Sequence, residues 1–101
     1  MASKYRAVPV TVDGIRFASK AEARRYQELK ALERAGKIAN LVLQPSYPLH
    51  GGVAYRADFA YDQDGRRVVE DVKGYETQVF RIKAKLFRAD YPDLDFRIVR
   101  A

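Results

Sequence analysis

The pair Asp64-Gly65 constrains the fold of this chain more than any other feature. An Asp-Gly pair between two strand-like segments is typical of a two-residue type I′ turn, which joins antiparallel strands. Residues 55–63 before the pair and residues 66–73 after it are therefore predicted to form a β-hairpin. With a two-residue turn, Gln63 faces Arg66, and the partner of every other residue in the hairpin follows from that pair.

A helix is predicted over residues 19–35, before the hairpin. Ser19 and Glu22 have the spacing of a capping box, in which each side chain binds a backbone amide at the start of a helix. Apolar residues follow at helical spacing, and Gly36 lies where a helix commonly ends in a left-handed residue.

The remaining segments complete a mixed α/β pattern. A strand is predicted over 38–44, a second helix over 78–91 and a last strand over 94–99. One broad apolar stripe of the second helix is expected to face the core, and it contains Val79, Phe80, Ile82, Leu86, Phe87 and Tyr91. A strand, a helix and a strand in succession pair their strands in parallel. The prediction is a single α/β domain (an α+β mixed sheet) over 1–101, with a helix on each face, in which residues 1–17 form an arm or an edge hairpin.

Composition excludes several classes of site. The 101 residues contain no Cys and one His, which rules out disulfides, thiolate zinc sites and His-rich metal sites. Nineteen Lys and Arg against 13 Asp and Glu give a net charge of +6, which favours a polyanionic partner, and nucleic acid over a membrane. Because no long apolar run and no signal peptide stand out, we expect a soluble intracellular protein.

Acidic residues inside the predicted hairpin are the candidates for chemistry, because strands disfavour them. In the predicted register Asp58 lies directly opposite Asp71, and Lys73 points to the same face as Asp71 while Glu70 points to the other. Two carboxylates this close repel unless a cation lies between them, and hard oxygen ligands suit Mg²⁺ or Mn²⁺. An ordinary cross-strand ion pair, Asp58 or Asp71 with Lys73 or Arg56, is the alternative.

These residues resemble the bipartite motif of the PD-(D/E)XK, or restriction-endonuclease-like, nucleases. Asp58 and the later Asp71-Val72-Lys73 match the two halves of the motif, with Ala57 in place of the Pro. The element order is similar to the αβββαβ core of that superfamily. The segments VDGIRFASKAEARRY, ADFAY and VVEDVKG look like those of small, mostly phage-encoded nucleases of the same superfamily, and archaeal-type Holliday junction resolvases are similar in size and layout.

The resemblance implies a set of site residues. It makes Glu22, Asp58, Asp71 and Lys73 catalytic, with Mg²⁺, or Mn²⁺ in its place, held by Asp58, Asp71 and less certainly Glu22. Glu22 also has the simpler role of a helix cap, and Glu70 replaces Asp71 at the metal if the turn is not of two residues. A DNA backbone track is expected from the basic residues Lys4, Arg6, Lys20, Arg24, Arg25, Arg81 and Lys83.

The function expected from the resemblance is cleavage of DNA by metal-activated water. Branched DNA such as a four-way junction is the leading substrate. A resolvase would be a homodimer with paired sites. It would act in the cytoplasm, and in the host cytoplasm if a phage encodes it. The alternatives are a nicking or degrading nuclease without junction preference, and a non-catalytic basic module that binds nucleic acid.

Overall fold

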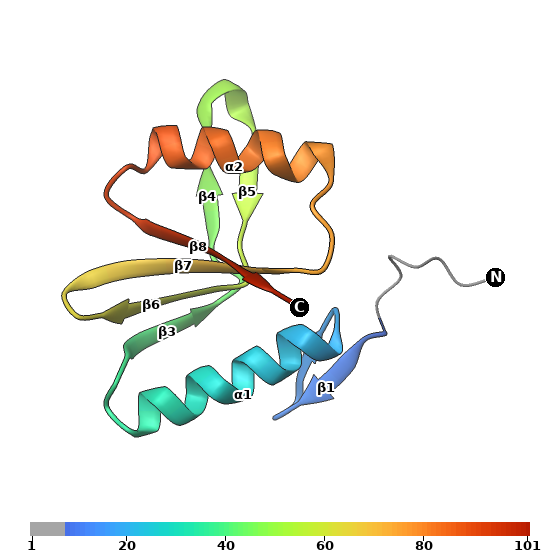
Figure 1. The fold of residues 1–101 in the computed structure, drawn as a ribbon, viewed down its shortest axis with the longest axis vertical. Helices are drawn as coiled ribbons and strands as arrows, with labels where there is room; N and C mark the ends of the chain where they lie inside the picture. The colour runs from blue at the N-terminus through green and yellow to red at the C-terminus, as the bar shows by residue number, and fades with distance from the viewer. Residues whose placement is uncertain (1–7) are drawn as a thin grey trace.

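The computed structural model describes residues 8–101 as one mixed sheet with a helix on either face (Figure 1). Four strands are hydrogen-bonded in the order β3-β6-β7-β8, and two further strand pairs lie outside this sheet. The elements are, in chain order, β1 Val10–Val12, β2 Ile15–Phe17, α1 Lys20–Arg34, β3 Ala39–Leu43, β4 Ser46–Pro48, the 3-10 turn η1 His50–Gly52, β5 Ala54–Arg56, β6 Phe59–Gln63, β7 Arg66–Lys73, α2 Gln78–Asp90 and β8 Asp95–Arg100.

The predicted hairpin register is confirmed. Gln63 pairs with Arg66, and the antiparallel ladder of β6 and β7 continues in that register to Phe59 and Glu70. Asp64 and Gly65 both have positive φ angles, of 51° and 77°, as a type I′ turn requires. The predicted crossover is also confirmed, because β8 pairs with β7 in parallel after α2.

Both helices begin and end where the sequence predicts, to within a residue of the caps. Ser19 precedes α1, and its side-chain oxygen accepts the backbone N–H of Glu22 at 3.1 Å. Thr77 caps α2 in the same way through the N–H of Phe80. Gly36 closes α1 in a left-handed conformation with φ of 74°.

Each helix packs on its own face of the sheet. On one face, α1 buries Ala23, Tyr26 and Leu29 in a cluster with Phe59 and Tyr61 of β6. On the other face, α2 buries side chains against the sheet and the ribbon β4–β5, and these are Phe80, Ala84 and Phe87. The two helices thus sandwich β6 and β7, whose side chains alternate between the two clusters.

The apolar stripe predicted for α2 is too broad. Val79 and Ile82 are 64% and 53% exposed, whereas Ala84 is buried. A 13-residue helix against one face of a small sheet buries a narrow stripe, and Phe80, Ala84 and Phe87 follow each other at intervals of four and three residues.

The single strand predicted over 55–63 is wrong, because the chain bends at Ala57 and Asp58. Tyr55 and Ala57 lie in the α2 cluster, whereas Phe59 and Tyr61 lie in the α1 cluster, so the expected alternation changes face at the bend. Before the bend, β5 pairs with β4 in a separate two-stranded ribbon. Figure 1 shows this ribbon leaving the sheet and crossing α2.

The N-terminal hairpin predicted within residues 1–17 is present in the described part of the chain. β1 and β2 pair around Asp13-Gly14, as a two-stranded sheet of their own rather than as an edge of the main sheet. The Tyr26 hydroxyl of α1 donates to Asp13 at 2.9 Å and ties the turn to the helix. Neither α1 nor α2, the α-helices of residues 8–101, is long and apolar enough to cross a membrane.

The positive φ at the β6–β7 turn gives a first prediction. Gly65→Ala places a side chain in a left-handed conformation and should lower the free energy of unfolding by about 1–2 kcal/mol. Gly74→Ala is the matched control, since Gly74 lacks a positive φ and an added Cβ would meet only an ordinary contact at 3.8 Å from Ala101. Urea unfolding measures both, and equal losses would contradict the turn assignment.

Candidate functional site

The bend at Asp58 creates the central contact of the site. The backbone of Asp58 leaves the ladder there, and its N–H donates to the Glu70 carbonyl at 3.1 Å. The amide of Val72 is instead bound by the Asp58 side chain, with 2.8 Å from the Val72 nitrogen to Oδ2. The carboxylate of Asp58 thus replaces a strand partner and is held against β7.

The two carboxyl groups predicted to face each other are in contact. Asp58 and Asp71 share a side-chain hydrogen bond, and burial together with this contact raises the pKa of Asp58 to about 8. Asp71 itself is 1% exposed, although it lies on a strand near the end of the sheet. One of the two carboxyls therefore holds a proton at neutral pH in the absence of a bound cation.

Lys73 lies beside this pair, on the same face. Its ammonium nitrogen is 3.4 Å from Asp71 Oδ1 and 4.6 Å from the centre of the Phe80 ring. The expected alternation of Asp71 and Lys73 on one face and Glu70 on the other is confirmed. The ion pair of Asp71 with Lys73, considered as the alternative, is present too, but it lies within β7 rather than across two strands.

Glu22 approaches the pair from the start of α1. Burial raises the pKa of Glu22, a hydrogen bond with the Ala18 backbone lowers it, and the charge of Asp71 raises it again. Lys73 and Arg56 act on the same carboxyl with positive charge. The Glu22 carboxyl group is therefore bound to a backbone amide at the start of α1 and is also influenced by the charge of Asp71. The predicted roles of helix cap and site residue are thus compatible.

Glu70, the neighbour of Asp71, has a different environment. It is completely buried on the α1 face, where Arg25 binds it through two hydrogen bonds of 2.9 and 2.7 Å and the Tyr61 hydroxyl donates to Oε2. A carboxylate with a bidentate guanidinium partner has its charge compensated within the protein. Asp71 rather than Glu70 is the carboxylate on the side of Asp58 and Lys73.

Arg25 has a role that its place among the predicted DNA contacts did not suggest. Its guanidinium is bound to Glu70, and the carboxylate raises the pKa of Arg25 further. The arginine thereby joins α1 to β7 behind the site. Helical periodicity contains the signal, because Arg25 lies three residues after Glu22 and one before the buried Tyr26, on the edge of the buried face.

Two further side chains belong to the site. Tyr55 is buried, and its hydroxyl donates to Asp71 Oδ2. Arg56, the next residue, is exposed and contributes positive charge at Glu22. The sequence already names Arg56 as an alternative ion-pair partner of the carboxylates, whereas Tyr55 would lie on the other face of an unbroken strand and reaches the site through the bend at Asp58.

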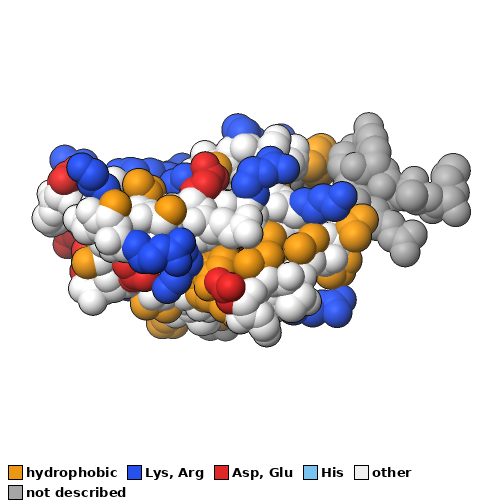
Figure 2. Space-filling model, turned by 90° about the horizontal axis from the view of Figure 1, so that it is seen from below, with side chains coloured by type: hydrophobic (Ala, Val, Ile, Leu, Met, Phe, Trp, Pro, Cys, Tyr) orange, Lys and Arg blue, Asp and Glu red, His pale blue; other side chains and the backbone are white. Residues whose placement is uncertain are grey.

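The other basic candidates lie on the two helices. Lys20, Arg24 and Arg81 are exposed, and Lys83 is half-buried. Both helices begin on the side of the sheet where β7 ends, so these residues lie toward the same end of the molecule as Lys73 (Figure 1). Lys4 and Arg6 lie outside the described residues. Figure 2 shows basic side chains spread over the face seen there, with acidic and apolar ones between them, rather than in one continuous patch.

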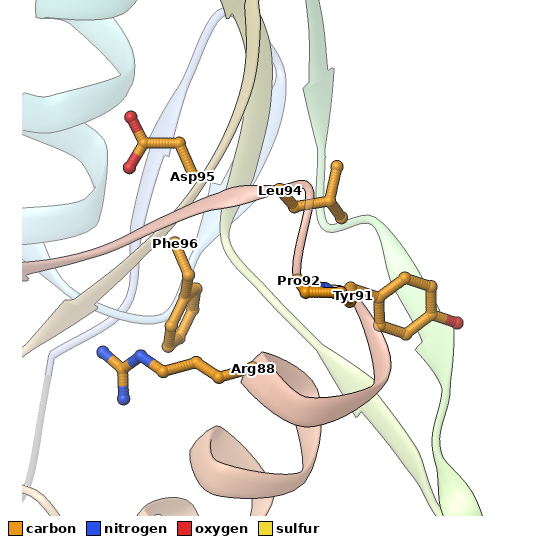
Figure 3. A pocket seen from close by; sticks show the side chains of 6 residues that line it. All are labelled: Arg88, Tyr91, Pro92, Leu94, Asp95 and Phe96. Atoms are coloured by element: carbon orange, nitrogen blue, oxygen red, sulfur yellow. The ribbon is translucent and has the colours of Figure 1, made fainter.

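A shallow hollow of about 320 Å³ lies at the opposite end of the sheet. It is formed where α2 ends and β8 begins, and it is lined by Arg88, Tyr91, Pro92, Leu94, Asp95 and Phe96 (Figure 3). Arg88 stacks on Phe96 there, with 4.9 Å from the guanidinium to the ring centre. The hollow is lined by none of the predicted site residues, so the acidic cluster is not part of this pocket.

One protein-family model matches nearly the whole chain, including all the residues of this site. Residues 2–101 match the model described as "Protein of unknown function (DUF1064)". The chain belongs to this family. No curated protein sequence gives a significant match to the chain.

The raised pKa of Asp58 gives a second prediction. Without a divalent cation the folded protein keeps this proton up to about pH 8, whereas the unfolded chain loses it near its ordinary value of 3.8. Stability should therefore fall as pH rises from 5 to 8, by at most about 1.4 kcal/mol per pH unit from this group. Asp58→Asn keeps the acceptor for Val72 and removes the charge, so it should flatten this slope.

Thermal melts in EDTA at pH 5, 6, 7 and 8 measure this effect. Asp58→Asn should melt at a higher temperature than the wild type at pH 8 and close to it at pH 5. Asp62→Asn, four residues further along the chain on β6, is the matched control, because hydrogen bonds from Asn40 and Arg67 lower the pKa of Asp62 instead. Identical pH slopes for the wild type and Asp58→Asn would show that Asp58 is not a neutral acid at neutral pH.

Proposed function

We propose that this chain is a metal-dependent nuclease that hydrolyses phosphodiester bonds of DNA. The observation that carries the proposal is the state of Asp58. Aspartates in ordinary ion pairs of this protein have a lowered pKa, as Asp62 does beside Asn40 and Arg67 and Asp95 does beside Arg97. The pKa of Asp58 is raised instead, first by burial and then by the neighbouring carboxyl group of Asp71. A pair of carboxyl groups in which one pKa is raised fits a site for a bound cation better than it fits a structural ion pair.

The donor set suits Mg²⁺ or Mn²⁺. Asp58 and Asp71 offer hard carboxylate oxygens. The site has two such ligands rather than three, because among residues 8–101 no group of three His, Asp or Glu side chains lies closely enough together to hold a metal ion. Mg²⁺ is commonly held by one or two carboxylates, with water and substrate phosphate in the remaining positions. When bound, such a cation lowers the pKa of its water and offsets negative charge on the phosphate.

The neighbouring side chains have complementary roles in this proposal. Lys73 places a positive charge 3.4 Å from Asp71, where it would donate to a phosphate oxygen or orient the attacking water. Glu22, with its raised pKa, would accept a hydrogen bond from that water at the start of α1. Asp71 and Asp58 hold their positions through Tyr55 and the Val72 amide respectively, so neither depends on the ligand for its orientation.

DNA as the polyanion is supported by charge and placement. The net charge is +6, and Lys20, Arg24, Arg81 and Lys83 lie on the two helices that begin at this end of the sheet. Branched DNA, with four-way junctions as the leading case, is the finer proposal, and it rests on the resemblance of the motif, the element order and the size to Holliday junction resolvases. A nuclease without junction preference is the alternative within the same chemistry.

A non-catalytic module that binds nucleic acid is the second candidate. It is favoured by the internal partners that each carboxylate already has, namely the Val72 amide for Asp58 and Tyr55 and Lys73 for Asp71. On this reading the cluster is structural, and its loss would affect DNA binding only through unfolding. The two candidates differ in what an isosteric Asp-to-Asn change does to a folded protein.

Cleavage of supercoiled plasmid gives the third prediction. The wild type should nick the plasmid with Mg²⁺ or Mn²⁺ and not with EDTA, and Asp71→Asn should lower the rate by about a hundredfold or more. Asp62→Asn, which removes a carboxylate from the far end of β6, should cut at the wild-type rate. A folded Asp71→Asn protein that cuts as fast as the wild type would refute the site.

Binding and substrate choice are measured with the same proteins. In EDTA, retardation of DNA by Asp71→Asn should persist or strengthen, because a negative charge facing phosphate is removed. Retardation by Asp58→Asn should persist, because that carboxyl group is already neutral near pH 7. Cleavage of a four-way junction beside a linear duplex of matched sequence decides between the finer proposals. Equal rates on the two substrates would favour the nuclease without junction preference.

The assembly of the protein is the fourth prediction. A four-way junction presents two equivalent strands to cut, so a resolvase should be a two-fold dimer with paired sites. Sedimentation at micromolar concentration should give twice the mass of 11.6 kDa, with or without junction DNA. A single-chain mass under both conditions would argue against a paired resolvase and leave the cleavage chemistry unaffected.

A further inference from the structure

We infer that Tyr55 is a positioning residue that selects which oxygen of Asp71 is available to a divalent cation. This inference rests on the proposed function and extends it to a residue outside the acidic motif. The Tyr55 hydroxyl donates to Oδ2 of Asp71, while the ammonium of Lys73 lies 3.4 Å from Oδ1. The two oxygens of the Asp71 carboxylate therefore have different partners, the neutral Tyr55 hydroxyl at Oδ2 and the Lys73 ammonium at Oδ1.

Burial makes this hydrogen bond consequential. Tyr55 is 4% exposed and Asp71 is 1% exposed, so water does not replace a lost donor at Oδ2. A neutral hydroxyl satisfies the oxygen without cancelling the charge of the carboxylate. A divalent cation at Oδ1 would then compete only with the Lys73 ammonium at 3.4 Å, whereas an arginine in place of Tyr55 would bind the carboxylate as Arg25 binds Glu70.

The hydroxyl is held in place by an aromatic cluster. The ring of Tyr55 lies 5.4 Å from Phe87 and 6.3 Å from Phe80, both of α2, and 5.9 Å from Phe96 of β8, measured between ring centres. Three contacts from two elements leave the ring little freedom to rotate. The ribbon β4–β5, which carries Tyr55, thus connects the packing of α2 to the orientation of Asp71.

The chain contains a matched control for this role. Tyr61 donates to Glu70 as Tyr55 donates to Asp71, so two adjacent acidic residues of β7 each have a buried tyrosine partner, on opposite faces of the sheet. Glu70 is compensated by Arg25 and does not face the acidic pair. Loss of either hydroxyl leaves a buried carboxylate oxygen with one donor fewer, but only the loss at Tyr55 affects the candidate cation site.

The test is direct binding of Mn²⁺ to the folded protein without DNA, followed by electron paramagnetic resonance of the free ion. Tyr55→Phe should bind Mn²⁺ about tenfold to a hundredfold more weakly than the wild type, as expected for loss of a hydrogen bond to a metal ligand. Tyr61→Phe should bind like the wild type. Thermal melts of the two variants should fall by similar amounts, so that stability does not explain a difference in affinity.

The results distinguish a failure of the proposed metal site from a failure of the role assigned to Tyr55. If the wild type binds Mn²⁺ and Asp71→Asn does not, the metal site of the proposed function holds. An unchanged affinity in Tyr55→Phe, or an equal weakening in Tyr61→Phe, would then overturn the inference about Tyr55 alone. If the wild type has no Mn²⁺ site that depends on Asp71, the proposed metal site and the role of Tyr55 both fail.

Discussion

The hydrogen bond from the Val72 amide to the Asp58 carboxylate is the contact on which the arrangement of the site depends. A β-strand that leaves a sheet exposes the amides of its neighbour, and a buried amide without an acceptor is costly. Asp58 supplies the acceptor from its side chain, at 2.8 Å, so its own backbone is free to bend. The bend then changes which face of the sheet the preceding residues occupy, and the ribbon β4–β5 can pack on α2.

The same bend explains why two adjacent acidic residues on β7 differ in their chemistry. Successive residues of a strand point to opposite faces, so Glu70 faces α1 and Asp71 faces α2 and the ribbon. On the α1 face a helix passes directly over the strand, and Arg25 neutralises the carboxylate. On the other face the bend brings a second carboxylate and a tyrosine instead. One buried acidic residue is therefore bound by a guanidinium, and the other lies beside a second carboxyl group, a tyrosine hydroxyl and the ammonium of Lys73.

The sequence predicts local features of this fold well, because each depends on a few neighbouring residues. The turn at Asp64-Gly65 sets the register of β6 and β7, and the caps at Ser19 and Thr77 set the starts of both helices. The closeness of Asp58 and Asp71 follows from that register. The bend does not, since a strand that alternates up to Gln63 gives no local sign of where its partner changes. Tyr55, whose role depends on the bend, is accordingly not predicted as part of the site.

The energetics of the acidic pair point away from a purely structural role. A carboxyl group whose pKa is raised by burial and by an acidic neighbour, as that of Asp58 is, lowers the stability of the folded protein at neutral pH, whereas one beside a guanidinium does not. Replacing Asp58 by Asn would keep the acceptor for Val72 and remove the repulsion, so structure alone gives no reason for an acid at this position. The cost is understandable if the pair is occupied by a cation during function, because the cation turns the repulsion into attraction. Groups that are unfavourable for folding and adjacent to one another are typical of sites kept for chemistry.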